Sequence, residues 1–275
     1  MEDLNNFLYA AVLIVTLAAV ITYLAYFVYR NRAIRRYARY ILVGSAVLQT
    51  CYIAARFVLI GYPPITTQHE AVVFFAWATT YAYLSFRWRY TVNNFGTFVS
   101  LVIMLLLVVS AFFSRESPVL VPVLQSGWLP VHAGLSVVAY GFFSLAFCGG
   151  CMYLLMEREL KKKRLGYFFE RLPSLGALDQ LNSHCVTTGF IFLTLGIVTG
   201  SFWAAQAWGA YWQWDPKETW SLITWMLYLV QIHQRFSAGM QGKKASIMAV
   251  ASFAAVLFTL WGVTYLLGGA HSYVG

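Results

Sequence analysis

The composition is that of a membrane protein. Of the 275 residues, 60% are hydrophobic and only 11% are charged, whereas charged residues make up about a quarter of an ordinary soluble domain. This excludes an ordinary soluble domain and indicates a polytopic membrane protein. The net charge of +9 raises the question of a nucleic-acid partner, which the positions of the charges answer below.

Eight apolar stretches approach the length of about 20 residues that crosses the hydrocarbon core of a bilayer. They cover residues 7–29, 40–61, 70–86, 95–113, 129–156, 185–204, 219–236 and 245–267. The sequence therefore predicts an all-α bundle of eight transmembrane helices, in a single integral membrane domain covering residues 1–275. The acidic start has no basic region, so no cleavable signal peptide is expected.

The basic residues occur in alternate connections between these spans. Sixteen of the 19 Lys and Arg residues follow the first, third, fifth or seventh span. Because short basic loops stay in the cytoplasm, we expect both termini outside the cytoplasm. The outer side then receives residues 62–69, 114–128, 205–218 and 268–275. Basic loops this short and scattered do not suit nucleic acid, so no nucleic-acid partner is expected.

An aromatic and polar segment, WGAYWQWDPKETW at residues 208–220, begins on the outer side. Tryptophan and tyrosine favour membrane interfaces, and Asp215, Pro216 and Glu218 suit the N-cap, first and third positions of a helix. However, five of the ten tryptophans fall between residues 203 and 220, whereas an interfacial belt would spread them over all span ends. An interfacial anchor and a platform for a flat apolar ligand both remain open.

Two of the five histidines are expected at the level of this segment. His132 lies at the outer start of the fifth span, and His271 lies just beyond the outer end of the eighth. Two neutral imidazoles at one level can supply both axial nitrogens of a haem iron, while indoles cover the porphyrin. These residues suit zinc less well, because a zinc site usually takes three or four protein ligands and only Asp215 is placed to join the two histidines.

Three other histidines and one arginine carry weaker signals. His233 lies roughly 21 Å into the seventh span at 1.5 Å per residue, where an ionisable group is a functional candidate. It could be a haem ligand, a proton relay or an interhelical hydrogen bond. His69 and His184 are expected to be structural. Arg56, within the second span, could snorkel outward or bind a haem propionate.

The four cysteines lie in or beside apolar runs: Cys51, Cys148, Cys151 and Cys185. Cys148 and Cys151 have CxxC spacing, but no histidine follows Cys151, so the pair is not a haem-attachment site. The run of small residues is best explained as easing helix contacts. A redox role would need an exposed, activated thiolate. We therefore expect four buried cysteines without a chemical role.

The segment from Trp208 to Trp220 resembles the WWD motif of the haem-handling membrane proteins of cytochrome c maturation. With the flanking outer histidines and the eight-span plan, the chain is similar to the CcsA (ResC-like) family of system II cytochrome c biogenesis, most clearly from the third span onward. The resemblance implies an external site for haem b, bound as a substrate. Its residues would be the axial ligands His132 and His271 and the WWD residues Trp208, Trp212, Trp214 and Asp215.

The same resemblance implies a second haem position within the membrane. It makes His233 a transmembrane haem ligand whose companion comes from a CcsB (ResB-like) membrane subunit. One departure is the start of the third span, where Thr67 to Ala71 lacks the family's Asn-x-Tyr-Glu-Ser type run. No role is therefore transferred to His69.

The implied function is that of a haem-handling subunit of a cytochrome c synthase. It would move or hold haem across the bilayer and present it outside for covalent attachment to the CxxCH motif of apocytochrome c. The attacking thiolates belong to the apocytochrome, so no catalytic residue is expected here, and whether the chain counts as an enzyme within a haem-lyase complex is left open. The expected location is the cytoplasmic (inner) membrane, with the WWD segment facing the periplasm or exterior, or the thylakoid membrane in a plastid.

Three other functions compete with this one. A haem chaperone of the CcmC type would have six spans rather than eight. A HemX-like protein controlling haem synthesis has a similar number of spans, but a full WWD run with both outer histidines favours the synthase subunit. A proton-coupled transporter without haem would use His233 and Arg56 as relay groups, and it would leave the tryptophan cluster unexplained.

Overall fold

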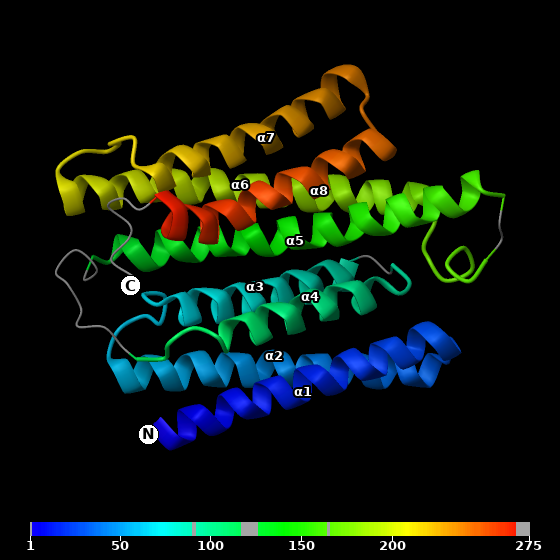
Figure 1. Ribbon diagram of the computed structural model, residues 1–275, viewed down its shortest axis with the longest axis horizontal. Coiled ribbons are helices and arrows are strands. Elements are labelled where there is room, and N and C mark those ends of the chain that lie inside the picture. The colour runs from blue at the N-terminus through cyan, green and yellow to red at the C-terminus, as the bar shows by residue number, and fades with distance from the viewer. Residues whose placement is uncertain (1, 90–91, 117–125, 164–165, 268–275) are drawn as a thin grey trace. The chain divides into compact units, whose positions relative to one another are not determined.

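The regular structure is entirely helical in the part of the chain that this computed structural model describes, residues 2–89, 92–116, 126–163 and 166–267. The elements in chain order are α1 (Glu2–Tyr29), α2 (Arg32–Ile60), α3 (Gln68–Arg89), α4 (Phe95–Ser110), α5 (Trp128–Lys161), α6 (Leu175–Trp208), α7 (Pro216–Ala238), α8 (Lys243–Leu257) and the π-helical η2 (Phe258–Leu267). Figure 1 shows η2 continuing α8. The predicted all-α bundle, with one helix for each of the eight apolar stretches, is confirmed.

The helices have the dimensions of membrane spans. Five of them are long and apolar enough to cross a bilayer: α1, α2, α5, α6 and α8 with η2. The helix α4 is apolar but shorter, with 16 residues. The protein is therefore an integral membrane helix bundle, while the count of eight crossings and the outward termini stay predictions.

Several helices extend beyond the apolar stretches because polar caps prolong them. α2 begins at Arg32 rather than at residue 40, since the Asn31 side chain accepts the Ala33 N–H at 2.8 Å and acts as an N-cap. α6 begins at Leu175 rather than at residue 185, behind the N-cap Ser174. Apolarity marks the part of a helix that lipid covers, so it understates the length of the helix.

The chain divides into two units, unit 1 (Met1–Pro118) and unit 2 (Val119–Gly275). In unit 1, α1 packs on α2 and α4, and α3 packs on α2 and α4. In unit 2, α5 packs along α6 and α8, and α7 packs against α6, α8 and η2. Each unit is described by itself, and the single membrane domain of residues 1–275 stays a prediction.

A buried ion pair closes one end of unit 1, where α2 ends and α3 begins. Arg56 Nε lies 2.9 Å from Glu70 Oε1, and both side chains are almost fully buried. The other carboxylate oxygen accepts the backbone N–H groups of Thr66 and Thr67 at 3.0 and 3.2 Å. The two expectations for Arg56, outward snorkelling and propionate binding, are therefore wrong, because its charge is neutralised inside the unit.

His69 belongs to the same buried cluster. Its Nε2 lies 2.7 Å from the Tyr52 hydroxyl, and its Nδ1 lies 2.8 Å from the Ser110 carbonyl oxygen. The Tyr9 hydroxyl completes the cluster with a hydrogen bond to the Leu107 carbonyl at 2.8 Å. Both imidazole nitrogens are thus used in joining α2, α3 and α4, and His69 is structural, as expected.

The glycines between the CxxC cysteines let helices approach closely in unit 2. A Cβ on Gly149 would lie 2.5 Å from the Leu181 side chain, and one on Gly150 would lie 2.9 Å from the Ser246 carbonyl oxygen. Small residues therefore ease the contacts of α5 with α6 and α8, as the sequence predicted. Of the four cysteines expected to be buried, Cys148 and Cys185 are buried, Cys151 is half-buried, and the expectation is wrong for Cys51, which is exposed on α2.

Asp179 joins α6, α7 and the turn before α8 at the end of unit 2 where α7 ends and α8 begins. Asp179 on α6 binds Arg235 Nη2 of α7 at 2.8 Å through Oδ2 and accepts the Gly242 N–H at 2.7 Å through Oδ1. These bonds fix the end of α7 and the turn that follows it. These bonds at the C-terminal end of α7 therefore help to orient the whole helix, including its start, which follows the tryptophan-rich segment.

Candidate functional site

The WWD segment connects α6 to α7. α6 ends at Trp208, and its C-cap Gly209 adopts a left-handed φ of 76° and donates its N–H to the Ala205 carbonyl at 3.0 Å. α7 begins behind Asp215, whose side chain accepts the Lys217 N–H at 2.9 Å. Pro216 stands in the first turn, and Asp215 and Glu218 form a capping box. The prediction that these acids start a helix is confirmed, so their carboxylates serve the backbone.

Glu218 also braces the segment itself, a role that the sequence did not reveal. Its Oε2 accepts the N–H of Gln213 at 2.9 Å as well as that of Asp215 at 3.3 Å. Gln213 in turn donates its side-chain N–H to the Trp208 carbonyl at 3.3 Å. One carboxylate of α7 therefore holds the turn that presents the tryptophans.

The last two tryptophans of the motif meet within this turn. Trp212 and Trp214 pack edge to face, with ring centroids 5.8 Å apart and an interplanar angle of 85°. Trp214 has a φ of 59°, which is rare for a bulky residue, and it is 70% exposed. Trp212 Nε1 is buried, and no acceptor for its hydrogen occurs among the residues that the structure describes. The turn thus offers one exposed indole and one inward N–H donor.

His132 is held in a defined orientation on α5. Its Nδ1 lies 2.7 Å from the Gly196 carbonyl oxygen of α6. Because a carbonyl oxygen only accepts hydrogen bonds, Nδ1 carries the hydrogen, and in the neutral imidazole Nε2 then carries the lone pair. Metal-binding histidines commonly donate a hydrogen bond from the N–H of their second ring nitrogen in this way. The tautomer and the orientation both suit coordination through Nε2.

Two glycines of α6 let α5 approach closely, one beside His132 and the other beside Ser136. A Cβ on Gly200 would lie 2.5 Å from His132 Nδ1, and a Cβ on Gly196 would lie 2.6 Å from Ser136 Oγ. The two glycines form a GxxxG motif, a known signal for close helix packing in membranes. The motif was present in the sequence, but which residue it accommodates depends on the pairing of α5 with α6.

An aromatic contact joins His132 to the WWD segment. The imidazole stacks nearly parallel to Trp203, with centroids 6.1 Å apart and an angle of 15°. Trp203 is only 1% exposed and meets Trp208 edge to face at 5.0 Å. The structure therefore brings His132 and Trp208 together through Trp203. The indoles meet at steep angles and do not form one flat surface.

His271 lies outside the described residues. The element that precedes it, η2, is fixed beside the start of α7: Trp220 packs on Phe258 with centroids 4.2 Å apart, and Thr224 Oγ1 lies 3.0 Å from Thr259 Oγ1. In Figure 1, η2 and the WWD segment lie at the same end of unit 2. In the sequence, His271 follows the end of η2 by four residues.

His233 lies elsewhere, on the exposed face of α7. It follows the N-cap Asp215 by 18 residues, which is roughly 27 Å along a helix. The same face carries exposed Met226, Val230 and Phe236. His184 is also exposed, on α6. The structure thus separates His233 from His132 and the WWD segment and places it on an apolar outer surface.

Known proteins resemble the chain over most of its length. A family model described as cytochrome C assembly protein matches residues 65–271. The chain belongs to the cytochrome c assembly protein family. The matched range contains the WWD segment and all three histidines predicted as haem ligands, so the resemblance seen in the sequence is confirmed.

Relatives named cytochrome c biogenesis protein CcsA support the same membership. The one from Chlamydomonas reinhardtii is 33% identical and aligns with 85% of this chain and 67% of its own. The one from Prochlorococcus marinus (strain NATL2A) is 32% identical, with coverages of 86% and 84%. A solved structure of the cytochrome c heme lyase CcmF has the same fold, with a TM-score of 0.64 at 19% identity. It aligns with 94% of this chain, which spans less than half of the CcmF chain.

Proposed function

We propose that this chain is the haem-handling subunit of a system II cytochrome c synthase. It would hold haem b as a substrate, carry it across the membrane and present it outside for attachment to the CxxCH motif of apocytochrome c. The observation that carries this proposal is His132, with Nδ1 bonded to Gly196 and its ring stacked on Trp203 beside the WWD segment. The orientation suits iron coordination, and the family is one of cytochrome c assembly.

His132 serves as one axial ligand in this proposal. The hydrogen bond from Nδ1 keeps the lone pair on Nε2 and restrains the ring, so little conformational entropy is lost when iron binds. His271 serves as the other axial ligand. Its support is the position of η2, which ends four residues before His271 and starts beside the first turns of α7.

The WWD segment encloses the porphyrin. Trp208 extends the aromatic contact from His132, and Trp214 offers an exposed ring for a flat apolar molecule. Trp212 Nε1, buried without an acceptor in the described part of the chain, can donate to a haem carboxylate. Asp215 contributes by capping α7 and so holding the tryptophans in place.

His233 serves as a ligand for haem on its way across the membrane. A haem iron with two axial ligands needs a second imidazole, and the exposed apolar face around His233 suits the approach of a helix from another protein. The companion ligand would come from a CcsB-type membrane subunit. The membrane would be the cytoplasmic membrane, with the WWD segment outside, or the thylakoid membrane in a plastid.

The transporter alternative loses one of its relay groups. Arg56 is neutralised by Glu70 in the interior of unit 1, and a guanidinium does not release its proton in proteins. No structural feature of the described residues favours a HemX-like role over the synthase.

The direct test is the haem content of the purified protein. The chain is produced with a CcsB-type partner and a CxxCH apocytochrome, and bound haem is measured as the pyridine haemochrome while covalent haem is measured on the cytochrome. His132→Ala should lose most bound haem and cytochrome maturation, and added imidazole should restore part of both. His184→Ala removes an exposed histidine elsewhere and should leave both unchanged.

Two outcomes would contradict the proposal. Absence of haem from the wild-type chain, both with and without its partner, would exclude a haem-handling role. Full haem content and full maturation in both His132→Ala and His271→Ala would exclude the axial assignment.

A further inference from the structure

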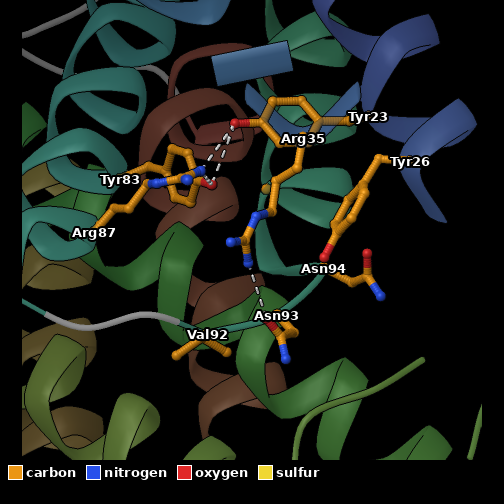
Figure 2. Close-up of a pocket in the computed structure, with 9 residues that line it drawn as sticks. Tyr23, Tyr26, Arg35, Tyr83, Arg87, Val92, Asn93 and Asn94 are labelled. Carbon is orange, nitrogen blue, oxygen red and sulfur yellow. Dashed lines mark hydrogen bonds between the residues drawn. The ribbon is translucent and has the colours of Figure 1, made fainter. Parts of the chain in front are cut away.

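A polar pocket lies at one end of unit 1, where α1 ends and α2 begins. Its volume is about 230 Å³. It is lined by two arginines, three tyrosines and the connection into α4: Arg35, Arg87, Tyr23, Tyr26, Tyr83, Val92, Asn93, Asn94 and Gly96. Figure 2 shows both guanidinium groups pointing into the space between these elements. None of these residues belongs to the haem site proposed above.

Both arginines are bonded to neutral groups. Arg35 Nη1 donates to the Asn93 side-chain oxygen at 3.3 Å, and Arg87 Nη1 donates to the hydroxyls of Tyr83 at 3.3 Å and Tyr23 at 3.5 Å. A guanidinium has five N–H donors, and the hydrogen bonds found among the described residues use only Nη1 of each. The pocket thus concentrates two positive charges and several hydrogen-bond donors.

No carboxylate of unit 1 can neutralise these charges. Residues 1–118 contain four acidic residues, namely Glu2, Asp3, Glu70 and Glu116. All four lie at or beyond the opposite helix ends: the start of α1, the start of α3 and the segment after α4. The 28 residues of α1 separate these ends by roughly 40 Å, which is several Debye lengths. The pocket end of unit 1 is therefore positive, and an anion is the ligand that it suits.

The pocket walls are held in place by packing. Tyr23 and Tyr83 hydroxyls lie 3.4 Å apart, and a Cβ on Gly96 would collide with the Tyr23 ring and the Tyr83 hydroxyl. Thr97 Oγ1 ties the start of α4 to the Tyr23 carbonyl at 3.2 Å. The phenol hydroxyls are thereby held where they can contribute hydrogen bonds to a bound oxyanion.

We propose that this pocket binds the phosphate group of an acidic phospholipid in the cytoplasmic leaflet. The basic end of a membrane helix bundle lies at the level of lipid headgroups on the cytoplasmic side. A guanidinium matches the geometry of a phosphate, on which it can form two parallel hydrogen bonds. The same ends of α1 and α2 carry exposed Leu24, Val28, Tyr37 and Tyr40, an apolar surface for the acyl chains.

The size of the pocket separates a headgroup from larger anions. Sites that enclose a drug-sized ligand have about 300–1,000 Å³, and a haem macrocycle is larger than a space of about 230 Å³ can hold. A phosphodiester with a small alcohol fits, while its chains remain outside the pocket. A soluble phosphate shares the same chemistry, so the test must separate the two sources.

The test compares lipid binding by variants that lose one positive charge each. Wild type, Arg35→Gln, Arg87→Gln and the matched control Arg36→Gln are purified as full chains, delipidated and titrated with phosphatidylglycerol or phosphatidylcholine, with bound lipid counted by native mass spectrometry. Arg36 is exposed on the same basic stretch and does not line the pocket. Arg35 is bonded only weakly to Asn93, so Arg35→Gln should fold, which circular dichroism checks.

We expect phosphatidylglycerol to bind more tightly than phosphatidylcholine. Arg35→Gln and Arg87→Gln should each weaken the binding of phosphatidylglycerol about tenfold. Arg36→Gln should change it less than about threefold. Equal losses in all three variants would show general attraction to basic residues and overturn the proposal. If inorganic phosphate at millimolar concentration stabilised the chain in phosphatidylcholine nanodiscs as much as phosphatidylglycerol does, the lipid assignment would be wrong. Displacement of phosphatidylglycerol by haem at the same two arginines would overturn it too.

Discussion

His132 and Gly196 join α5 to α6 through a hydrogen bond of 2.7 Å between Nδ1 and the carbonyl oxygen. The bond decides which imidazole nitrogen carries the lone pair, and it exists because Gly196 and Gly200 let the two helices approach closely. The hydrogen bond to Gly196 therefore orients the His132 imidazole for coordination through Nε2. The packing of α6 is thus part of the proposed haem site.

Gly200→Ala tests this dependence without removing a ligand. The added methyl group would meet the imidazole, and overpacking of this kind costs about 1–3 kcal/mol. We expect less bound haem and a changed Soret spectrum, because His132 must rotate away from Gly196. The control is Gly176→Ala on the same helix, where a Cβ meets open space. An unchanged spectrum in Gly200→Ala would show that the position of His132 against Gly196 and Gly200 does not affect haem binding.

Glu218→Ala should loosen the WWD segment. The side chain accepts N–H groups from Gln213 and Asp215, and loss of such capping bonds costs about 1–2 kcal/mol. We expect lower haem content, measured as the pyridine haemochrome, with helix content preserved in circular dichroism. Glu218→Gln keeps one carbonyl oxygen in place and should lose less. Equal haem content in wild type and Glu218→Ala would argue against the bracing role.

His233→Ala should separate haem binding within the membrane from folding. The side chain is exposed on α7, so its removal should leave the melting temperature within about 2 °C of wild type. In a complex with a CcsB-type subunit, we expect reduced haem and partial recovery with added imidazole. His184→Ala, exposed on α6, is the matched control. Normal haem content in the His233 variant of that complex would remove His233 from the haem route.

The Arg56–Glu70 pair should matter for stability alone. Glu70→Ala leaves a buried guanidinium without its partner, which costs about 3–5 kcal/mol, and unfolding in denaturant should show this loss. The double variant Arg56→Met with Glu70→Ala should recover part of it. The control pair is Glu157 with Lys161, where the lysine is 64% exposed and substitution should cost less than about 0.5 kcal/mol. A Glu70→Ala variant as stable as wild type would contradict the buried pair.

Much of the fold was predictable because it depends on local composition. Each apolar stretch became a helix, since lipid requires the backbone to satisfy its own hydrogen bonds. Asp215, Pro216 and Glu218 predicted the start of α7 from their order alone, because a capping box involves only neighbouring residues. The WWD run identified the family for the same reason, as its signal is contiguous in the chain.

The tertiary structure decided what depends on residues far apart in the chain. Arg56 became the partner of Glu70 rather than a surface residue, and Cys51 became exposed, because helix rotation and packing determine which side chains meet. The seat of His132 on Gly196 and Gly200 required α5 and α6 to pair in one register. The sequence by itself thus determined the helices, their caps and the chemical groups available. Close packing between helices decided which of those groups are oriented for binding and which make their hydrogen bonds and ion pairs within the core. The reason is that each packed side chain contacts several residues that are distant in the sequence.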